Sequence, residues 1–263
     1  MEQIIESEGY NIFVKTQGEG PPVLLLHSYL GSLNLFDDLA NELSKNRTVI
    51  RIDLPGHGDS STPPSDYRFD AFAGAIAELL QKLNIAGKIA LIGHSMGGYI
   101  AMAFADRFPE RIESLILIHS PIRSADDLSI KSRNREATLL RNGKKDLLLQ
   151  VTIPSNFAPE LKPETEGLVA LIHQTARQVT TDGALRSIEA MNHRCNSLKT
   201  LQNEKYPILI IIVKHDNVYS PETQLEDALS IPRAEVLLLG DSGHMGFMEE
   251  PEIVLSSLLP FLS

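Results

Sequence analysis

The sequence predicts an α/β fold in which a doubly wound, mostly parallel sheet is covered by helices. Three observations support this prediction: short apolar runs alternate with segments of helical spacing, the runs are apolar throughout, and one long helical stretch interrupts the alternation. Continuously apolar strands are buried on both faces, which is typical of parallel sheets. Strands that alternate with helices build such a sheet from successive βαβ units.

Short apolar runs mark the expected strands, and helical spacing marks the segments between them. The expected strands are residues 23–26, 48–53, 89–93, 112–119, 208–213 and 235–239. Apolar residues recur at steps of three and four over 35–43, 69–83, 96–108 and 253–262, which predicts amphipathic helices. Pro109 closes the helix at 96–108, because proline cannot continue a helix.

The stretch 121–200 contains helical patterns and no convincing strand candidate, and its charge differs from that of the rest. It carries 12 basic and 9 acidic residues, a net charge of +3, whereas the remaining residues carry 12 and 25, a net charge of −13. An insertion after a parallel strand starts at the strand's carboxyl end, where open α/β sheets bind ligands. We therefore expect residues 121–200 to form a helical cap on a core made of residues 1–120 and 201–263.

The composition excludes several classes of protein. A net charge of −10, with no basic run longer than Lys144-Lys145, argues against nucleic acid or an anionic membrane as the main partner. The single cysteine, Cys195, rules out disulfides within the chain and a cysteine-based zinc site. The N-terminus has no apolar signal segment, and the longest apolar run, 208–213, is far shorter than the ~20 residues that cross a bilayer. We therefore expect a cytoplasmic protein.

The segment Gly93-His94-Ser95-Met96-Gly97 lies between a predicted strand and a predicted helix. A serine in such a sharp turn is strained, and glycines two residues to either side let strand and helix backbones approach. Its hydroxyl then stands at a helix N-terminus, where free N–H groups can bind a developing oxyanion. Ser95 is therefore the candidate nucleophile.

A serine nucleophile needs a base, and His244 is the strongest candidate among the eight histidines. It lies in a glycine-containing loop directly after strand 235–239, at the same edge of the sheet as Ser95. His94 is adjacent to Ser95 in sequence and is expected to point elsewhere. His27 and His119 also follow strands, where packing or hydrogen bonding within a loop is the more ordinary role.

The base in turn needs an orienting carboxylate, and Asp216 follows the neighbouring strand 208–213. The chain order Ser95, Asp216, His244 is the nucleophile–acid–base order of one particular fold. The alternative acids are Asp241, Asp126 and Asp127.

The turn after strand 23–26, His27-Ser28-Tyr29-Leu30-Gly31-Ser32, is the expected source of a second oxyanion donor. We expect the main-chain N–H groups of Tyr29 and Met96 to bind the oxyanion together.

With these residues assigned, the chain resembles the α/β-hydrolase fold enzymes over nearly its whole length outside the cap. The resemblance rests on LLLHSYLGS, RIDLPGHGDS, LIGHSMGG, VKHDNVYSPE and DSGHMGFMEEPE. It implies an eight-stranded sheet, a helical cap after the sixth strand, and neither cofactor nor metal. Two positions depart from the family pattern: Ser28 replaces the usual glycine after His27, and the loop that carries Asp216 has Val213 where glycine is common.

The expected function is that of a serine hydrolase that cleaves a small ester or lactone through an acyl-enzyme. A serine nucleophile disfavours the dehalogenase and epoxide-hydrolase branches, and the chain has no tryptophan to bind a halide. One alternative keeps the three residues but changes the chemistry to C–C bond hydrolysis, perhydrolysis or a lyase step. Another is a non-catalytic receptor that reuses the fold.

The basic stretch 121–200 over an acidic core also raises the question of substrate charge. Arg123, with Arg133 and Arg135 on the following helix, is expected near the mouth of the site, where a guanidinium would favour a substrate that carries a carboxylate. Ser28 and Met245 are further candidates for substrate contact. The alternative is that the arginines are solvated and pair with the cap's own carboxylates, Asp126, Asp127 and Glu136.

Overall fold

The computed structural model describes residues 1–159 and 163–263 and contains one eight-stranded sheet. In spatial order the strands are β1 (Glu2–Ser7), β2 (Tyr10–Gln17), β4 (Thr48–Ile52), β3 (Pro22–Leu26), β5 (Ile89–His94), β6 (Ile112–Ile118), β7 (Ile208–Val213) and β8 (Ala234–Leu239). The strands from β4 to β8 in this order pair in parallel, while β1 and β2 pair antiparallel with each other and β2 with β4. The predicted mostly parallel sheet is confirmed.

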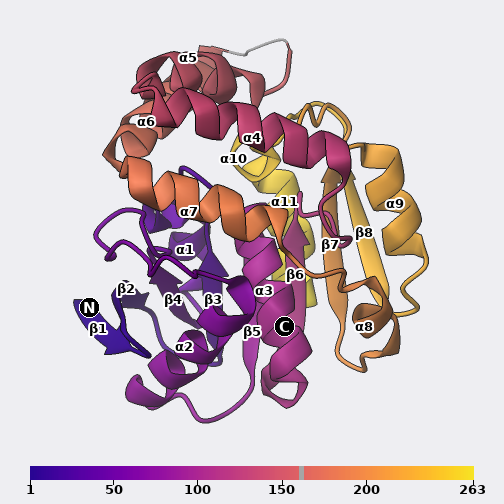
Figure 1. Cartoon of the computed structure of the whole chain (residues 1–263). Coiled ribbons are helices and arrows are strands. Elements are labelled where there is room, and N and C mark those ends of the chain that lie inside the picture. Colours follow the sequence, from indigo (N-terminus) through magenta and orange to yellow (C-terminus); the bar gives the residue numbers. More distant parts are fainter. Residues whose placement is uncertain (160–162) are drawn as a thin grey trace.

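Helices cover both faces of the sheet, as a doubly wound fold requires. In Figure 1, α2 (Phe69–Lys82) and α3 (Met96–Arg107) lie in front, and α1 (Asp37–Leu43) and α11 (Pro251–Phe261) lie behind. Two further helices, α9 (Pro221–Leu229) and α8 (Leu198–Asn203), lie near β7 and β8. The strands β3, β5, β6 and β7 are almost wholly buried because helices cover both of their faces.

Between β6 and β7 the described chain forms helices and no strand. These helices are α4 (Asp127–Arg141), α5 (Lys145–Ser155), α6 (Pro163–Gln178), α7 (Thr181–Asn192) and the short α8. The first four, named here the inserted helices, lie together above the sheet (Figure 1). Asp126 caps α4 by accepting a hydrogen bond from the Ser129 N–H, and Thr180 caps α7 in the same way from Gly183.

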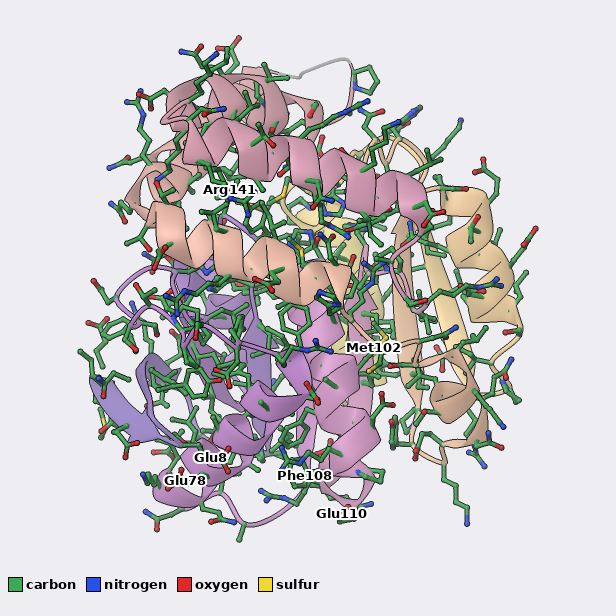
Figure 2. All side chains as sticks on the ribbon, viewed as in Figure 1. Glu8, Glu78, Met102, Phe108, Glu110 and Arg141 are labelled. Carbon is green, nitrogen blue, oxygen red and sulfur yellow. The ribbon has the colours of Figure 1, made fainter. Side chains whose placement is uncertain are left out.

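The N-terminal hairpin and the edge strand β8 differ from the expectations. The sequence reading found no strand before residue 23, yet β1 and β2 form a hairpin whose turn residues Glu8 and Gly9 have φ values of 44° and 83°. Glu78 of α2 holds this turn by accepting from the Glu8 N–H at 2.7 Å (Figure 2). β8 is an edge strand and is only partly buried, so Leu238 is exposed despite its apolar run. No helix among the described residues has the length and apolar character needed to cross a membrane.

Candidate active site

Ser95 lies in a strained turn between β5 and α3. Its φ of 52° and ψ of −113° place it in a region that side chains rarely adopt. The Ser95 N–H donates to the Ile118 carbonyl at 2.9 Å, which fastens the turn to the end of β6. A Cβ atom at Gly97 would collide with the main chain of Leu26, and one at Gly93 with that of Gly97. The two glycines are therefore required for the close approach of strand and helix.

Two main-chain N–H groups at the same edge of the sheet as Ser95 have no acceptor among the described residues. Met96 is the first residue of α3, so its N–H has no acceptor within the helix. Within the described part of the chain, neither the Met96 N–H nor the Tyr29 N–H donates a hydrogen bond. Tyr29 follows β3, the immediate neighbour of β5, so both groups lie at the same edge of the sheet.

Asp216 and His244 form a buried pair at the ends of β7 and β8. The Asp216 Oδ2 atom lies 3.1 Å from His244 Nδ1, and the two side chains are 0% and 5% exposed. The second carboxylate oxygen accepts from the N–H groups of Val218 at 2.7 Å and Tyr219 at 3.1 Å. Burial alone would raise the pKa of Asp216, but the charge and hydrogen bond of His244 outweigh it and lower that pKa overall. The carboxylate is thus charged and oriented toward the imidazole.

The structure separates Asp216 from the other candidate acids. Asp126 is used as the cap of α4, Asp127 is exposed in the first turn of that helix, and Asp241 is exposed. The Ser95 hydroxyl makes no hydrogen bond with His244 in the part of the chain described, and such contacts often tighten only when substrate binds.

His94 and His119 surround His244. The His94 Nε2 atom lies 2.9 Å from the His244 carbonyl oxygen, and the two imidazole rings are 5.1 Å apart. His94 thus fixes the main chain of the loop that carries His244, next to the turn of Ser95. The His119 ring lies 6.0 Å from that of His244. Burial, followed by the effect of His244, lowers the pKa of His119 to about 3, so it stays neutral.

Two further histidines hold the turn that carries Tyr29. His27 Nε2 accepts from the Leu54 N–H at 2.8 Å, while its Nδ1 lies 2.8 Å from the Ser28 carbonyl oxygen. His57 Nε2 accepts from the Leu30 N–H at 3.2 Å. Burial lowers the pKa of His27 well below its ordinary value and that of His57 to about 4. Both rings are therefore neutral, as acceptors of main-chain hydrogen bonds must be.

Tyr219 connects the inserted helices to the Asp216–His244 pair. Its ring lies 5.8 Å from that of His244, and its hydroxyl shares a hydrogen bond with the hydroxyl of Tyr99 on α3. Arg133 of α4 donates to the Tyr219 hydroxyl at 3.0 Å and to Asn192 Oδ1 of α7 at 3.3 Å. The sequence reading did not single out either tyrosine, because their roles depend on contacts between distant segments.

Arg123 is paired with a carboxylate of the core. Its guanidinium binds the Asp227 carboxylate of α9 in a bidentate pair, with N–O distances of 2.6 to 3.0 Å. The Arg123 side chain is 53% exposed, whereas that of Asp227 is 3% exposed. The alternative that Arg123 pairs with Asp126 or Asp127 is therefore wrong, because the buried carboxylate of Asp227 takes it as its counter-ion. Arg123 still lines a cavity beside Tyr219, so its contact with substrate stays a prediction.

The other two candidates for substrate contact lie in the loops that carry Tyr29 and His244. Ser28 is buried next to Tyr29, and its carbonyl oxygen accepts from the Gly31 N–H at 3.0 Å. Met245 is buried, and its N–H donates to the Asn156 carbonyl at 3.1 Å. The loop that carries His244 is therefore attached to the end of α5.

Two cavities border the Tyr99–Tyr219 pair. One of about 570 Å³ is lined by Tyr219, Arg194 and residues of α4 and α9. The other, of about 310 Å³, is lined by Tyr99, Arg194 and Met102, the last of which is labelled on α3 in Figure 2. Volumes in this range suit small-molecule ligands. Among the described residues, no group of three or more His, Cys, Asp or Glu side chains could hold a metal ion.

Comparison with known proteins identifies the family of this chain. The model of the α/β hydrolase fold family matches residues 21–251. Lipase 3 of Moraxella sp. (strain TA144) is 30% identical over 242 residues, which cover 88% of this chain and 73% of the lipase. A thermophilic esterase from Thermogutta terrifontis, solved with malate bound, has a TM-score of 0.92 and 27% identity over 100% of this chain and 98% of its own.

The enol-lactonase from Burkholderia xenovorans LB400 has a TM-score of 0.91 and 25% identity, with 99% of both chains covered. The family model and these relatives extend across most of the chain, including both the sheet and the segment between β6 and β7. The chain therefore belongs to the α/β hydrolase fold family and is an enzyme of the esterase and lactonase kind.

Proposed function

We propose that the protein is a serine hydrolase that cleaves a small ester or lactone through an acyl-enzyme, with Ser95, His244 and Asp216 as its catalytic triad. The observation that carries this proposal is the arrangement at three strand ends: a strained serine beside free N–H groups, and a buried imidazole–carboxylate pair. Ser95 attacks the acyl carbon while His244 takes its proton, and Asp216 stabilises the imidazolium that forms.

The free N–H groups of Tyr29 and Met96 are assigned to the oxyanion of the tetrahedral intermediate. His244 then returns its proton to the leaving alcohol, and water attacks the acyl carbon with His244 as base again. Residues 121–200 are assigned the role of a cap, because Arg133 and Asn192 connect the inserted helices to Tyr219 above the triad. The esterase and enol-lactonase relatives favour an ester or lactone over a C–C bond.

Turnover of 4-nitrophenyl esters of increasing chain length, measured beside a few simple lactones, tests this proposal. We expect a burst of 4-nitrophenol equal to the number of Ser95 sites, followed by steady turnover, and neither phase in Ser95→Ala. A burst without turnover would instead indicate a receptor that is acylated once. Steady turnover by Ser95→Ala would refute the assignment of the nucleophile.

A further inference from the structure

Arg133 is a buried cation, and it makes no ion pair with a carboxylate of the described residues. The residue is only 7% exposed, and both of its hydrogen-bonding partners, Tyr219 and Asn192, are neutral. No ion pair of Arg133 exists among the residues that the structure describes. Two other arginines have carboxylate partners, since Arg51 binds Asp37 and Arg123 binds Asp227. Arg194 is also buried, but it donates to the main-chain carbonyls of Arg123 and Met191 and stacks on Tyr99.

The missing partner has an energetic consequence. A guanidinium is always charged, and its removal from water costs free energy that neutral hydrogen-bond partners offset only in part. A carboxylate supplies the opposite charge and matches the planar donor fork with two parallel hydrogen bonds. The environment of Arg133 is therefore complementary to an anion that is not part of the described chain.

Arg133 also lies in the right place to meet a substrate. It contacts Tyr219, whose ring is 5.8 Å from that of His244. Arg133 also acts on Tyr29. Burial and the charge of Glu136 raise the pKa of the Tyr29 hydroxyl well above its ordinary value, and the positive charge of Arg133 lowers it in part. Tyr29 follows β3 and Tyr219 follows β7, and the strand that leads into Ser95 lies between these two in the sheet. Arg133 thus acts on residues that follow β3 and β7, on either side of the strand that leads into Ser95.

The Tyr29 hydroxyl adds a second polar group without a partner. Its oxygen is buried and makes no hydrogen bond within the structure. Glu136, one turn along α4 from Arg133, would repel an anion when charged, but burial raises its pKa to about 7, so it is partly protonated at neutral pH. At neutral pH, Glu136 therefore offsets the charge of Arg133 only in part.

We propose that Arg133 binds a free carboxylate of the substrate, so that the site prefers an ester or lactone that also carries a carboxylate group. This inference rests on the proposed function, because it assigns the substrate class of the same site. Arg133 is a specificity residue and takes no part in bond cleavage.

Binding to Ser95→Ala tests the inference without any turnover. Isothermal titration calorimetry compares monomethyl adipate, which is anionic, with dimethyl adipate, which is neutral, at low and high salt. We expect the anion to bind more tightly, with a preference that salt weakens. Adding Arg133→Gln should weaken binding of the anion about 10- to 100-fold and leave the neutral ester nearly unchanged. Adding Arg133→Lys should give an intermediate loss, since it keeps the charge but not the fork.

Arg141→Gln is the matched control, because Arg141 is an exposed arginine at the far end of the same helix (Figure 2). It should leave the preference for the anion intact. Equal binding of the two ligands, or an equal loss of both in Arg133→Gln, would overturn the inference, because a purely structural arginine affects both alike. If Arg133→Gln does not fold, two other measurements test the inference. These are the salt dependence of anion binding to Ser95→Ala with Arg133 intact, and the loss of anion binding in Arg133→Lys.

Kinetics separate this inference from the proposed function. The protein with Ser95 intact should hydrolyse mono-4-nitrophenyl adipate with a higher kcat/KM than its methyl-capped counterpart. Hydrolysis of both at equal rates would refute the carboxylate preference and leave the serine hydrolase standing. Hydrolysis of neither would count against the proposed function, while the binding experiment would still decide the role of Arg133.

Discussion

Replacement of Glu136 with glutamine should make the protein more stable at alkaline pH and leave it unchanged at acid pH. Burial raises the pKa of this carboxyl from 4.5 to about 7. The folded state therefore holds the proton more tightly than the unfolded state does. The stability that this proton contributes is fully present below pH 4.5 and is lost as the pH rises through 7. Glutamine does not titrate and avoids that loss.

The size of the effect follows from the shift in pKa. A rise of about 2.5 units corresponds to about 3.4 kcal/mol of unfolding free energy at about 1.36 kcal/mol per unit. This value is an upper limit, because the side chain keeps part of its contact with solvent. At about 2 °C per kcal/mol for a chain of this length, Tm of Glu136→Gln should exceed that of the wild type by up to about 7 °C above pH 8.

Differential scanning calorimetry from pH 5 to pH 8.5 measures this difference. Glu110→Gln is the control, since it removes an exposed carboxylate beside β6 (Figure 2). The difference in Tm between Glu136→Gln and the wild type should increase as the pH rises. The difference between Glu110→Gln and the wild type should stay constant. A difference for Glu136→Gln that is constant, or that decreases with rising pH, would refute the argument that burial holds the proton on Glu136.

Three further predictions concern Ser95, Asp216 and Arg123. Ser95→Ala should lower kcat for a 4-nitrophenyl ester by roughly 10⁵- to 10⁶-fold with an unchanged far-ultraviolet spectrum. Asp216→Asn should lower kcat by about 10⁴-fold, because it disturbs the orientation of His244; near-normal activity would reopen the assignment of the acid. Arg123→Ala should lower Tm, since it leaves the buried Asp227 unpaired, without changing the preference for an anionic over a neutral ester; a lost preference would return Arg123 to the site.

The catalytic candidates could be predicted because each directly follows a strongly apolar strand. Parallel strands bring their carboxyl ends to one edge, so the sequence neighbours of β5, β7 and β8 must meet there. The strain at Ser95 could also be predicted, because Gly93 and Gly97 let the strand and helix main chains approach without a Cβ atom between them. The N-terminal hairpin was missed, although Gly9 lies between two segments of partly alternating polarity, which is a hairpin signal.

The side-chain environment of the arginines could not be predicted from the sequence. Arg123 and Arg133 are ten residues apart and carry the same charge, yet one is fastened to a buried carboxylate and the other is buried without one. The partner of Arg123 is Asp227, 104 residues away on a helix of the core. Such pairings depend on how the inserted helices dock on the sheet, which local spacing does not encode.

The hydrogen bonds of the histidines also depend on contacts between segments that are distant in the sequence. His27 and His57 bind main-chain groups of the neighbouring strand ends and loops, and nothing in their local sequence distinguishes them from catalytic histidines. The structure assigns a structural role to His27 and His57, because each ring is buried and accepts a hydrogen bond from a main-chain N–H group. His244 differs because its imidazole lies within hydrogen-bond distance of a carboxylate, at 3.1 Å from Asp216, whereas His27 lies 3.9 Å from Asp53.

Labelling with a fluorophosphonate tests the central claim most directly, because it reports the nucleophile and its activation in one measurement. Peptide mass spectrometry should find a single adduct on the peptide that contains Ser95. The rate of labelling should fall sharply in His244→Gln, because the imidazole no longer removes the proton of the serine. An adduct on another residue, or labelling of His244→Gln as fast as that of the wild type, would contradict the account.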